Sequence, residues 1–329
     1  MKRALLCSAF AALLTGCGLC PSPPSAATGT AARYPITDVA SAPATPVRNQ
    51  AKSGTCWAFG GVSLIESEAI RTRRCTPDLS EMWVVRHAYF EKAVKYVRTR
   101  GRVAFDQGGE IQDVLWLVDR YGIVPQSLYE GGAADGTYDH ASLAKAIRRL
   151  AKRIVDKKLY EKEHWQRMID EELDRRLGAR PDRFVIDGVA YTPFSYADSI
   201  GFRRDDYVAL TSFTHHPFFE RFVLEIPDNW AAHATLNIPL DSLMRLLDSA
   251  LAAGYTAAWD ADVSERGFGR RAGIALLPQQ EGRITLPAPE IVVDQPLRQR
   301  MFDTQATTDD HVMHIVGTAV DSLGNSYYK

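Results

Sequence analysis

A lone cysteine at the boundary between a loop and a helix constrains this chain more than any other feature. Residues 50–59 read Gln-Ala-Lys-Ser-Gly-Thr-Cys-Trp-Ala-Phe, and residues 53–55 are turn and capping types. Apolar side chains then recur at helical spacing over residues 57–70, which predicts a helix with Cys56 at its N-terminus. Unpaired backbone N–H groups and the positive end of the helix dipole favour the reactive thiolate at that place.

Gln50 is a side-chain donor that the loop can bring beside the same sulfur, so a nucleophile and a candidate oxyanion donor would lie together. The alternative is that Cys56 is a small buried hydrophobic residue, the ordinary role of a single cysteine near an aromatic. The ordered string favours catalysis, because Gln followed by Ser-Gly-Thr-Cys-Trp-Ala-Phe resembles the nucleophile segment of papain-like cysteine peptidases.

Composition limits the alternatives. The chain has 329 residues, of which 46% are hydrophobic, and can bury one large or two modest cores. Its formal net charge of -1 gives no sign of a nucleic-acid partner.

The N-terminus has the pattern of an export signal. Lys2 and Arg3 precede an apolar stretch over residues 4–14, and Leu-Thr-Gly-Cys at residues 14–17 resembles a bacterial lipobox, which predicts lipidation of Cys17. An ordinary secretory signal cut nearby is the alternative, and both export the protein. Residues 18–45 are rich in Pro, Ala, Ser and Thr, which predicts a flexible tether too short for a long inhibitory propeptide.

Few cysteines remain for structural use. An exported protein could pair Cys20 with Cys75, but a reactive Cys56 must stay free. Papain-like endopeptidases usually carry a further cysteine where Ser53 stands here. We therefore expect no disulfide framework.

Two further segments extend the resemblance. Asp78 or Ser80 can cap a core helix that runs towards Val97, and the Leu-Ser-Glu sequence there is similar to a segment of the family. A Gly108-Gly109 turn precedes an amphipathic helix over residues 111–121. In papain-like enzymes a matching Gly-Gly lines the cleft, so the resemblance implies that Gly108 and Gly109, with Trp57 nearby, bind substrate.

Residues 141–177 combine apolar positions at helical spacing with balanced charge, which predicts one long or two shorter surface helices. Papain-type enzymes place the catalytic histidine roughly 130 to 150 residues after the cysteine, whereas the best candidate here, His311, lies 255 positions after Cys56. The implied insertion resembles the bleomycin hydrolase and aminopeptidase C branch. The pair His215-His216 lies in this region, but adjacent histidines in regular structure do not readily aim both rings at one ion. No Cys or HExxH spacing accompanies them, so we expect no metal site.

His311 begins a polar-to-apolar segment that predicts a buried strand continuing through Val320. A glycine follows six residues later, as it does after the base in papain-like enzymes, which favours His311 as the base. His314 would face the opposite side of the strand, where a packed histidine is the ordinary case. The family's histidine-orienting Asn is missing: neither Asn229 nor Asn325 lies in the expected Asn-Ser-Trp context.

The last residues, Ser-Tyr-Tyr-Lys, are typical of the start of the strand that would carry this Asn, so we expect the sequence to be a C-terminally truncated fragment. Such a chain would lack the group that orients the histidine. Endopeptidase and aminopeptidase specificity stay open at this point.

The sequence therefore predicts an α+β, papain-like two-lobe fold with a helical insertion. The expected segments are a signal (1–17), a tether (18–45), a helical lobe (46–135), a helical insertion (136–230) and a β-rich lobe with His311 (231–329).

The predicted function is an exported cysteine peptidase, of aminopeptidase type rather than endopeptidase, without cofactor. Its partners would be peptide substrates and, through Cys17 alone, a membrane; the sequence leaves a homo-oligomer open. A catalytically inactive binding lipoprotein and a cysteine acyltransferase are the alternatives.

Overall fold

The computed structural model describes residues 3–6, 35–132, 137–270, 272–279 and 288–329. Mixed helices and strands confirm the predicted α+β class. The chain divides into two compact units: unit 1 comprises Met1–Ser41, Glu265–Val292 and Gly317–Lys329, and unit 2 comprises Ala42–Ser264 and Val293–Val316. These units follow other boundaries than the predicted lobes, since unit 2 contains both the predicted helical lobe and the strand of His311; the lobe boundaries stay a prediction.

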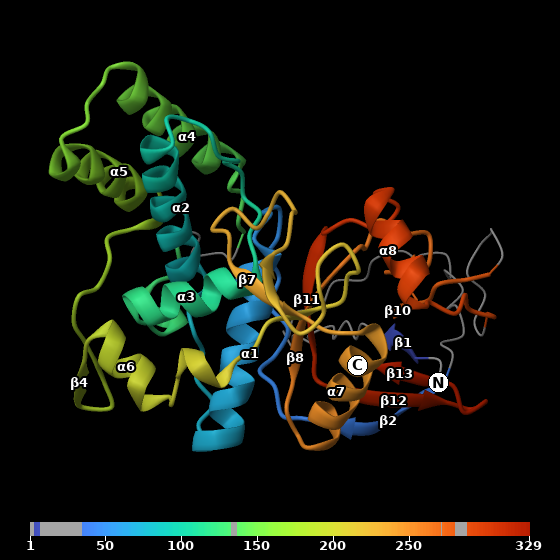
Figure 1. Ribbon diagram of the computed structural model, residues 1–329. Coiled ribbons are helices and arrows are strands. Elements are labelled where there is room, and N and C mark those ends of the chain that lie inside the picture. Colours follow the sequence, from blue (N-terminus) through green and yellow to red (C-terminus); the bar gives the residue numbers. More distant parts are fainter. Residues whose placement is uncertain (1–2, 7–34, 133–136, 271, 280–287) are drawn as a thin grey trace, which may run out of the picture. The chain divides into compact units, whose positions relative to one another are not determined.

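The helices lie in unit 2 (Figure 1). They are α1 (Cys56–Arg73), α2 (Glu81–Arg98), α3 (Ile111–Tyr121), α4 (Ala141–Asp156), α5 (Lys162–Leu177), α6 (Pro193–Ser199), α7 (Leu240–Ala252) and α8 (Gln295–Asp303), with the short 3-10 turns η1 (Gln126–Leu128) and η2 (Arg204–Asp206). No helix among the described residues is both long and apolar enough to cross a membrane.

The strands of unit 2 form small sheets. They are β3 (Phe184–Ile186) with β4 (Val189–Tyr191), β5 (Leu210–Thr211) with β7 (Ala234–Asn237) and β6 (Arg221–Val223), and β8 (Ala257–Ala261) with β11 (His311–Ile315). In unit 1 the sheet order is β2 (Ile36–Ser41), β12 (Gly317–Asp321), β13 (Ser326–Tyr328), β1 (Arg3–Leu6), β10 (Ile274–Ala275) and β9 (Phe268–Gly269).

The predicted helix with Cys56 at its N-terminus is confirmed, since α1 begins at Cys56. Two glycines on it allow close packing: a Cβ at Gly60 would lie 2.6 Å from Val312 Cγ1, and one at Gly61 would lie 2.6 Å from Val114 Cγ2. Strand β11 and helix α3 therefore approach the backbone of α1 directly. This packing fixes the start of β11 relative to the start of α1.

Helix α2 packs against α1 and against α4 and α5. Ser80 caps it as predicted, its Oγ accepting a hydrogen bond from Trp83 N at 2.9 Å. Arg86 is fully buried and donates to Asp170 and Asp174 on α5. In Figure 1, α4 and α5 lie beside one end of α2, so the 141–177 segment forms two helices, one of the two forms that its periodicity allows.

The predicted strand through Val320 is wrong in one respect, because it breaks at Val316. β11 pairs antiparallel with β8, placing Val312 opposite Asp260, whereas β12 pairs with β2 and β13. β12 and β13 form a hairpin whose turn contains Gly324 at φ +83°. The Asp321 carboxylate accepts hydrogen bonds from Leu323 N and Asn325 N and holds this turn.

The predicted export signal falls largely outside the described residues, and Cys17 and Cys20 are among those not described. Arg3–Leu6 forms β1 between β13 and β10. Cleavage before Cys17 would remove this strand, so β1 belongs to the uncleaved chain.

Candidate active site

Cys56 lies at the start of α1 with its thiol against the backbone of β11. Burial has the largest effect on the Cys56 thiol and raises its pKa. Hydrogen bonds with the backbone of Val312 and of Trp57 lower this pKa, whereas the carboxylates of Asp260 and Asp228 raise it. We expected the helix N-terminus to favour the thiolate, whereas the net effect of these groups is a raised pKa of the thiol. The helix contribution is present, but desolvation and two carboxylates oppose it.

A short loop before α3 packs against the nucleophile segment. Gly54 N donates to Gln107 Oε1 at 2.9 Å, and Trp57 Nε1 donates to Gln107 O at 3.0 Å. A Cβ at Gly108 would lie 1.9 Å from Asp228 Oδ2. The close approach that Gly108 permits is thus made by Asp228; the substrate-binding role of Gly108 and Gly109 stays a prediction.

The predicted substrate contact of Trp57 is wrong. Trp57 is 1% exposed and belongs to the core, and its indole N–H donates to the Gln107 carbonyl. A side chain that is buried and hydrogen-bonded in this way holds the two loops together, and it presents no surface to a peptide.

The two candidate histidines of β11 face opposite sides, as the strand period predicts. His314 Nδ1 lies 2.8 Å from Ser63 Oγ on α1, and burial lowers the pKa of His314 to about 4. His314 is therefore the packed histidine. His311 is the first residue of β11, opposite Ala261 and next to Val312, whose backbone contacts the Cys56 thiol.

Gln50 lies in the turn that precedes α1. Its Nε2 donates to Ser53 O at 2.7 Å, while Ser53 N donates to Gln50 O at 3.1 Å. These two hydrogen bonds fold Gln50 back onto the nucleophile loop. Its second side-chain N–H is the group that an oxyanion role would use.

The two asparagines considered as histidine partners serve local structure. Asn229 Nδ2 donates to Leu224 O and His233 O, and Asn325 Nδ2 donates to Asp321 Oδ2 in the hairpin turn. Both side-chain amides are used in loop geometry, as their sequence contexts suggested.

An acidic cluster beside Cys56 was not predicted. Carboxylate oxygens of Glu110, Asp260 and Asp309 all lie within 4.8 Å of one another. Individually the three residues have ordinary sequence contexts: one precedes a helix, one lies in a strand and one precedes a strand.

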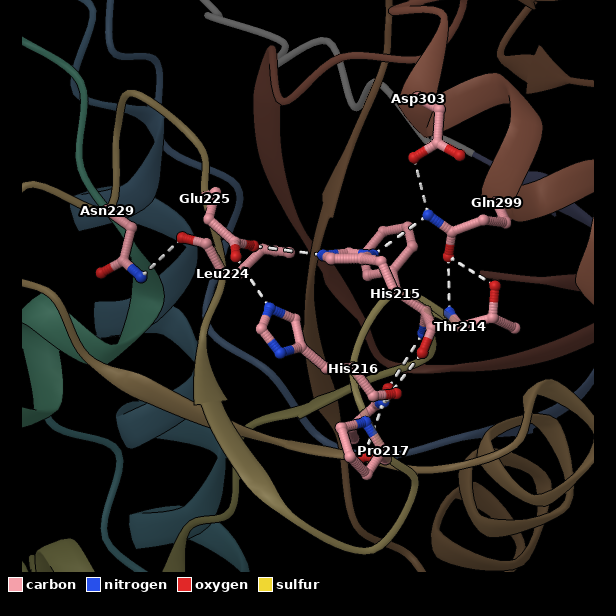
Figure 2. A network of polar contacts seen from close by, with 11 residues as sticks. Thr214, His215, His216, Pro217, Leu224, Glu225, Asn229, Gln299 and Asp303 are labelled. Carbon is pink, nitrogen blue, oxygen red and sulfur yellow. Dashed lines mark hydrogen bonds and ion pairs between the residues drawn. The ribbon is translucent and has the colours of Figure 1, made fainter.

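His215 and His216 converge on the carboxylate of Glu225 (Figure 2). Their Nε2 atoms lie 3.1 Å and 2.7 Å from the two oxygens of Glu225, because the pair stands in a bend outside regular structure. Gln299 lies 3.0 Å from His215 Nδ1 and donates to Asp303 at 2.7 Å, which links the bend to α8. The absence of a metal there stays a prediction.

Cys56 and Cys75 are free thiols. Since Cys75 is half-buried and lies outside the nucleophile loop, it is an internal reference for the reactivity of Cys56.

The fold and the position of the cysteine define the class. Residues 35–168 match the model of the papain family cysteine proteases, which confirms the predicted likeness to a papain-like cysteine peptidase.

The chain is also similar to two individual proteins. The chain is 22% identical over 321 residues to aminopeptidase C of Lactococcus lactis subsp. cremoris, covering 85% of this chain and 72% of that protein. The crystal structure of PepW from Lactobacillus rhamnosis HN001 matches with a TM-score of 0.63 and 16% identity, over 89% of this chain and 79% of that one. The predicted likeness to aminopeptidase C is confirmed.

Proposed function

We propose that this protein is an exported cysteine peptidase that removes N-terminal residues from peptides, with Cys56 as nucleophile and His311 as acid and base. The relative named aminopeptidase C supports exopeptidase action. Peptides are the substrates, and the mechanism needs no cofactor.

The observation that carries the proposal is the packing of α1 on β11. Gly60 lets Val312 approach the helix, and the Cys56 thiol contacts the Val312 backbone. His311, the neighbour of Val312, therefore stands at the same end of both elements as Cys56. A thiol at the start of α1 and an imidazole at the start of the strand packed on it can supply the pair that acyl transfer requires.

The reaction follows from these two groups. His311 takes the thiol proton, and the Cys56 thiolate attacks the peptide carbonyl carbon. As the tetrahedral intermediate collapses, the C–N bond breaks and the His311 imidazolium gives its proton to the leaving amine. His311 then takes a proton from water, the hydroxide attacks the thioester, and the Cys56 thiol leaves with the returned proton.

The oxyanion of each intermediate needs donors. The backbone N–H of Cys56 belongs to the first turn of α1, whose N–H groups have no partner within the helix. Gln50 Nε2 has a second hydrogen besides the one that it donates to Ser53. These two groups are the proposed oxyanion donors.

Thiol labelling tests this proposal directly. Iodoacetamide or an E-64-type reagent, followed by peptide mapping, should modify Cys56 much faster than Cys75, and fluorogenic aminoacyl substrates should protect Cys56. Equal labelling of both cysteines, with no cleavage of aminoacyl substrates by the full chain, would remove the peptidase assignment.

Export through a lipid anchor at Cys17 is part of the same proposal. The basic start, the apolar stretch and the Leu-Thr-Gly-Cys sequence support it. Labelling of expressing cells with an alkyne fatty acid should mark the wild type and not Cys17→Ser. A fatty-acid signal that is equal in both proteins would contradict the anchor.

A further inference from the structure

The carboxyl groups of Glu110, Asp260 and Asp309 come from three different elements. Glu110 precedes α3, Asp260 lies in β8, and Asp309 precedes β11, yet their oxygens lie within 4.8 Å of one another. Such convergence brings like charges together, which opposes ionisation unless a cation is present. We refer to these three residues as the acidic cluster.

The acidic cluster is adjacent to the nucleophile. Asp260 is paired across the sheet with Val312, whose backbone contacts the Cys56 thiol. Asp260 also raises the pKa of Cys56, as does Asp228, so both carboxylates act on the sulfur over a short range. The cluster therefore borders the point at which a scissile carbonyl would lie.

The cluster also contains unpartnered atoms. Glu110 is 8% exposed, and its Oε1 is buried without a hydrogen-bond partner among the described residues. Asp309 Oδ2 is also buried without a hydrogen-bond partner among the described residues. Buried carboxylate oxygens are almost always hydrogen-bonded, so these atoms are arranged for a donor that comes from outside the chain.

The strongest charges on Glu110 are all acidic. Burial and then Asp260, Asp113, Asp309 and Asp228 raise its pKa to about 9. Burial first, with neighbouring carboxylates, also raises the pKa of Asp260 to about 7 and of Asp309 to about 6.

The nearby buried cation is engaged elsewhere. Lys92 donates to Asp106 O at 2.7 Å and to Gly108 O, and its charge acts on Asp228. It lies 5.3 Å from the centre of the Trp230 ring. Lys92 thus balances Asp228 and the loop before α3.

We propose that Glu110, Asp260 and Asp309 bind an ammonium group of the peptide substrate beside Cys56. An ammonium group supplies three N–H donors and one positive charge. It can therefore donate hydrogen bonds to the unpartnered carboxylate oxygens and compensate their charge. The proposal rests on the peptidase function and deepens it, because it names the feature of the substrate that the site selects.

The α-ammonium is the source that geometry favours. The amino nitrogen and carbonyl carbon of one residue are separated by about 2.5 Å, and a carboxylate oxygen binds an ammonium nitrogen at about 2.8 Å. A carboxylate that holds the α-ammonium therefore lies within about 5 Å of the scissile carbonyl, next to the attacking sulfur. The same chemistry could come from a lysine side chain in the preceding residue, which the test separates.

The test compares three substrates with one leaving group: alanyl, N-acetyl-alanyl and N-acetyl-lysyl-alanyl amides. The alanyl amide should be cleaved best, and Glu110→Gln or Asp309→Asn should lower kcat/KM for it by about 10- to 100-fold, with N-acetyl-alanyl amide unchanged. Glu163→Gln, on the exposed start of α5, is the matched control and should change neither.

Each other outcome has a defined meaning. Fastest cleavage of the N-acetyl-lysyl substrate assigns the ammonium to a side chain and keeps the proposal. Equal losses on acetylated and free-amine substrates would make the carboxylates structural and overturn it. Stoichiometric Ca²⁺ binding that Glu110→Gln abolishes, without amine selectivity, would overturn it in favour of a metal site.

A second readout does not need turnover. Cys56 should react faster with cationic 2-aminoethyl methanethiosulfonate than with the anionic 2-sulfonatoethyl reagent, relative to Cys75 in the same molecule. Glu110→Gln and Asp309→Asn should reduce that ratio. If no substrate is cleaved but the ratio behaves in this way, the peptidase function fails while the cation site stands; a ratio that both variants leave unchanged overturns the site.

Discussion

Two groups of acidic and polar side chains in unit 2 differ in how their charges are compensated. Glu225 receives a histidine on each carboxylate oxygen, and the hydrogen bond from His216, before that from His215, lowers its pKa (Figure 2). Glu110 is buried beside Asp260 and Asp309, and its pKa is raised to about 9. Both carboxylate oxygens of Glu225 are therefore partnered, whereas Oε1 of Glu110 has no hydrogen-bond partner among the described residues.

The difference separates a structural network from a binding site. The Glu225 network joins a bend to α8 through Gln299 and needs nothing from outside. The acidic cluster costs free energy in the folded chain, because desolvated like charges lie together. A cationic ligand recovers that free energy, so unsatisfied carboxylates beside a nucleophile indicate substrate selection.

The largest expected effect is at the nucleophile. Cys56→Ala should lower kcat/KM on aminoacyl substrates by on the order of 10⁴-fold or more, because the acyl-enzyme can no longer form. Cys75→Ala is the matched control and should retain full activity. Circular dichroism would verify that both variants fold. Comparable losses of activity in both folded variants would contradict the assignment of Cys56.

The second largest loss of activity is expected for a substitution of His311 in the candidate active site, compared with His216 in the Glu225 network. His311→Ala should lower kcat on the order of 10²- to 10⁴-fold, since general acid and base catalysis is lost. His216→Ala, which removes one partner of Glu225, should leave kcat unchanged. Steady-state kinetics at one pH compare the two, and an equal loss would show that neither histidine is specific to the reaction.

A third prediction concerns stability and pH. The folded-state pKa of Glu110 is about 9 against 4.5 for a free side chain, so above pH 4.5 the folded protein keeps a proton that the unfolded chain has lost. Stability should therefore fall as pH rises from 4.5 towards about 9. Glu110→Gln should flatten this slope and raise the free energy of unfolding at pH 9 by on the order of 1–3 kcal/mol.

Urea unfolding at pH 5, 7 and 9 measures that slope. Asp260, with a raised pKa of about 7, contributes in the same direction and remains in the variant. An unchanged slope in Glu110→Gln would mean that Glu110 is already charged and compensated in the folded chain.

The smallest effect is expected in the Glu225 network. The pKa of Glu225 is lowered, so its contribution to stability is present above pH 4.5 and is lost as pH falls through the folded-state value. Because Glu225 is 58% exposed, Glu225→Gln should cost less than about 1 kcal/mol at pH 7. If Glu225→Gln changed the free energy of unfolding as much as Glu110→Gln does, the Glu225 network and the acidic cluster would not differ in how their charges are compensated.

Local patterns were sufficient for the helices. The Ser80 cap and the apolar spacing after Cys56 each act within a few residues, so α1 and α2 start where the sequence predicts. Helix α3 likewise has the bounds that its amphipathic pattern predicts. The break at Val316 could not be predicted, because β11 and β12 pair with strands that are distant in sequence.

The same distinction between local and long-range patterns applies to the residues of the candidate site. Cys56, Gln50 and His311 stand in short ordered strings, which local reading detects. The acidic cluster forms only where three distant segments meet in the fold. The sequence around Glu110 therefore does not predict that Asp260 or Asp309 lies close to it. Trp57 was misassigned for a related reason, since an aromatic next to a nucleophile has the same local pattern whether it faces substrate or core.

Trapping of the acyl-enzyme tests the central claim most directly. The protein would be mixed with an alanyl ester, quenched in acid within the first turnover and digested for mass spectrometry. The account predicts one alanyl group on the peptide that contains Cys56, none on the peptide of Cys75, and none in Cys56→Ala. Hydrolysis of the ester without acylation of Cys56, or acylation of another residue, would contradict it.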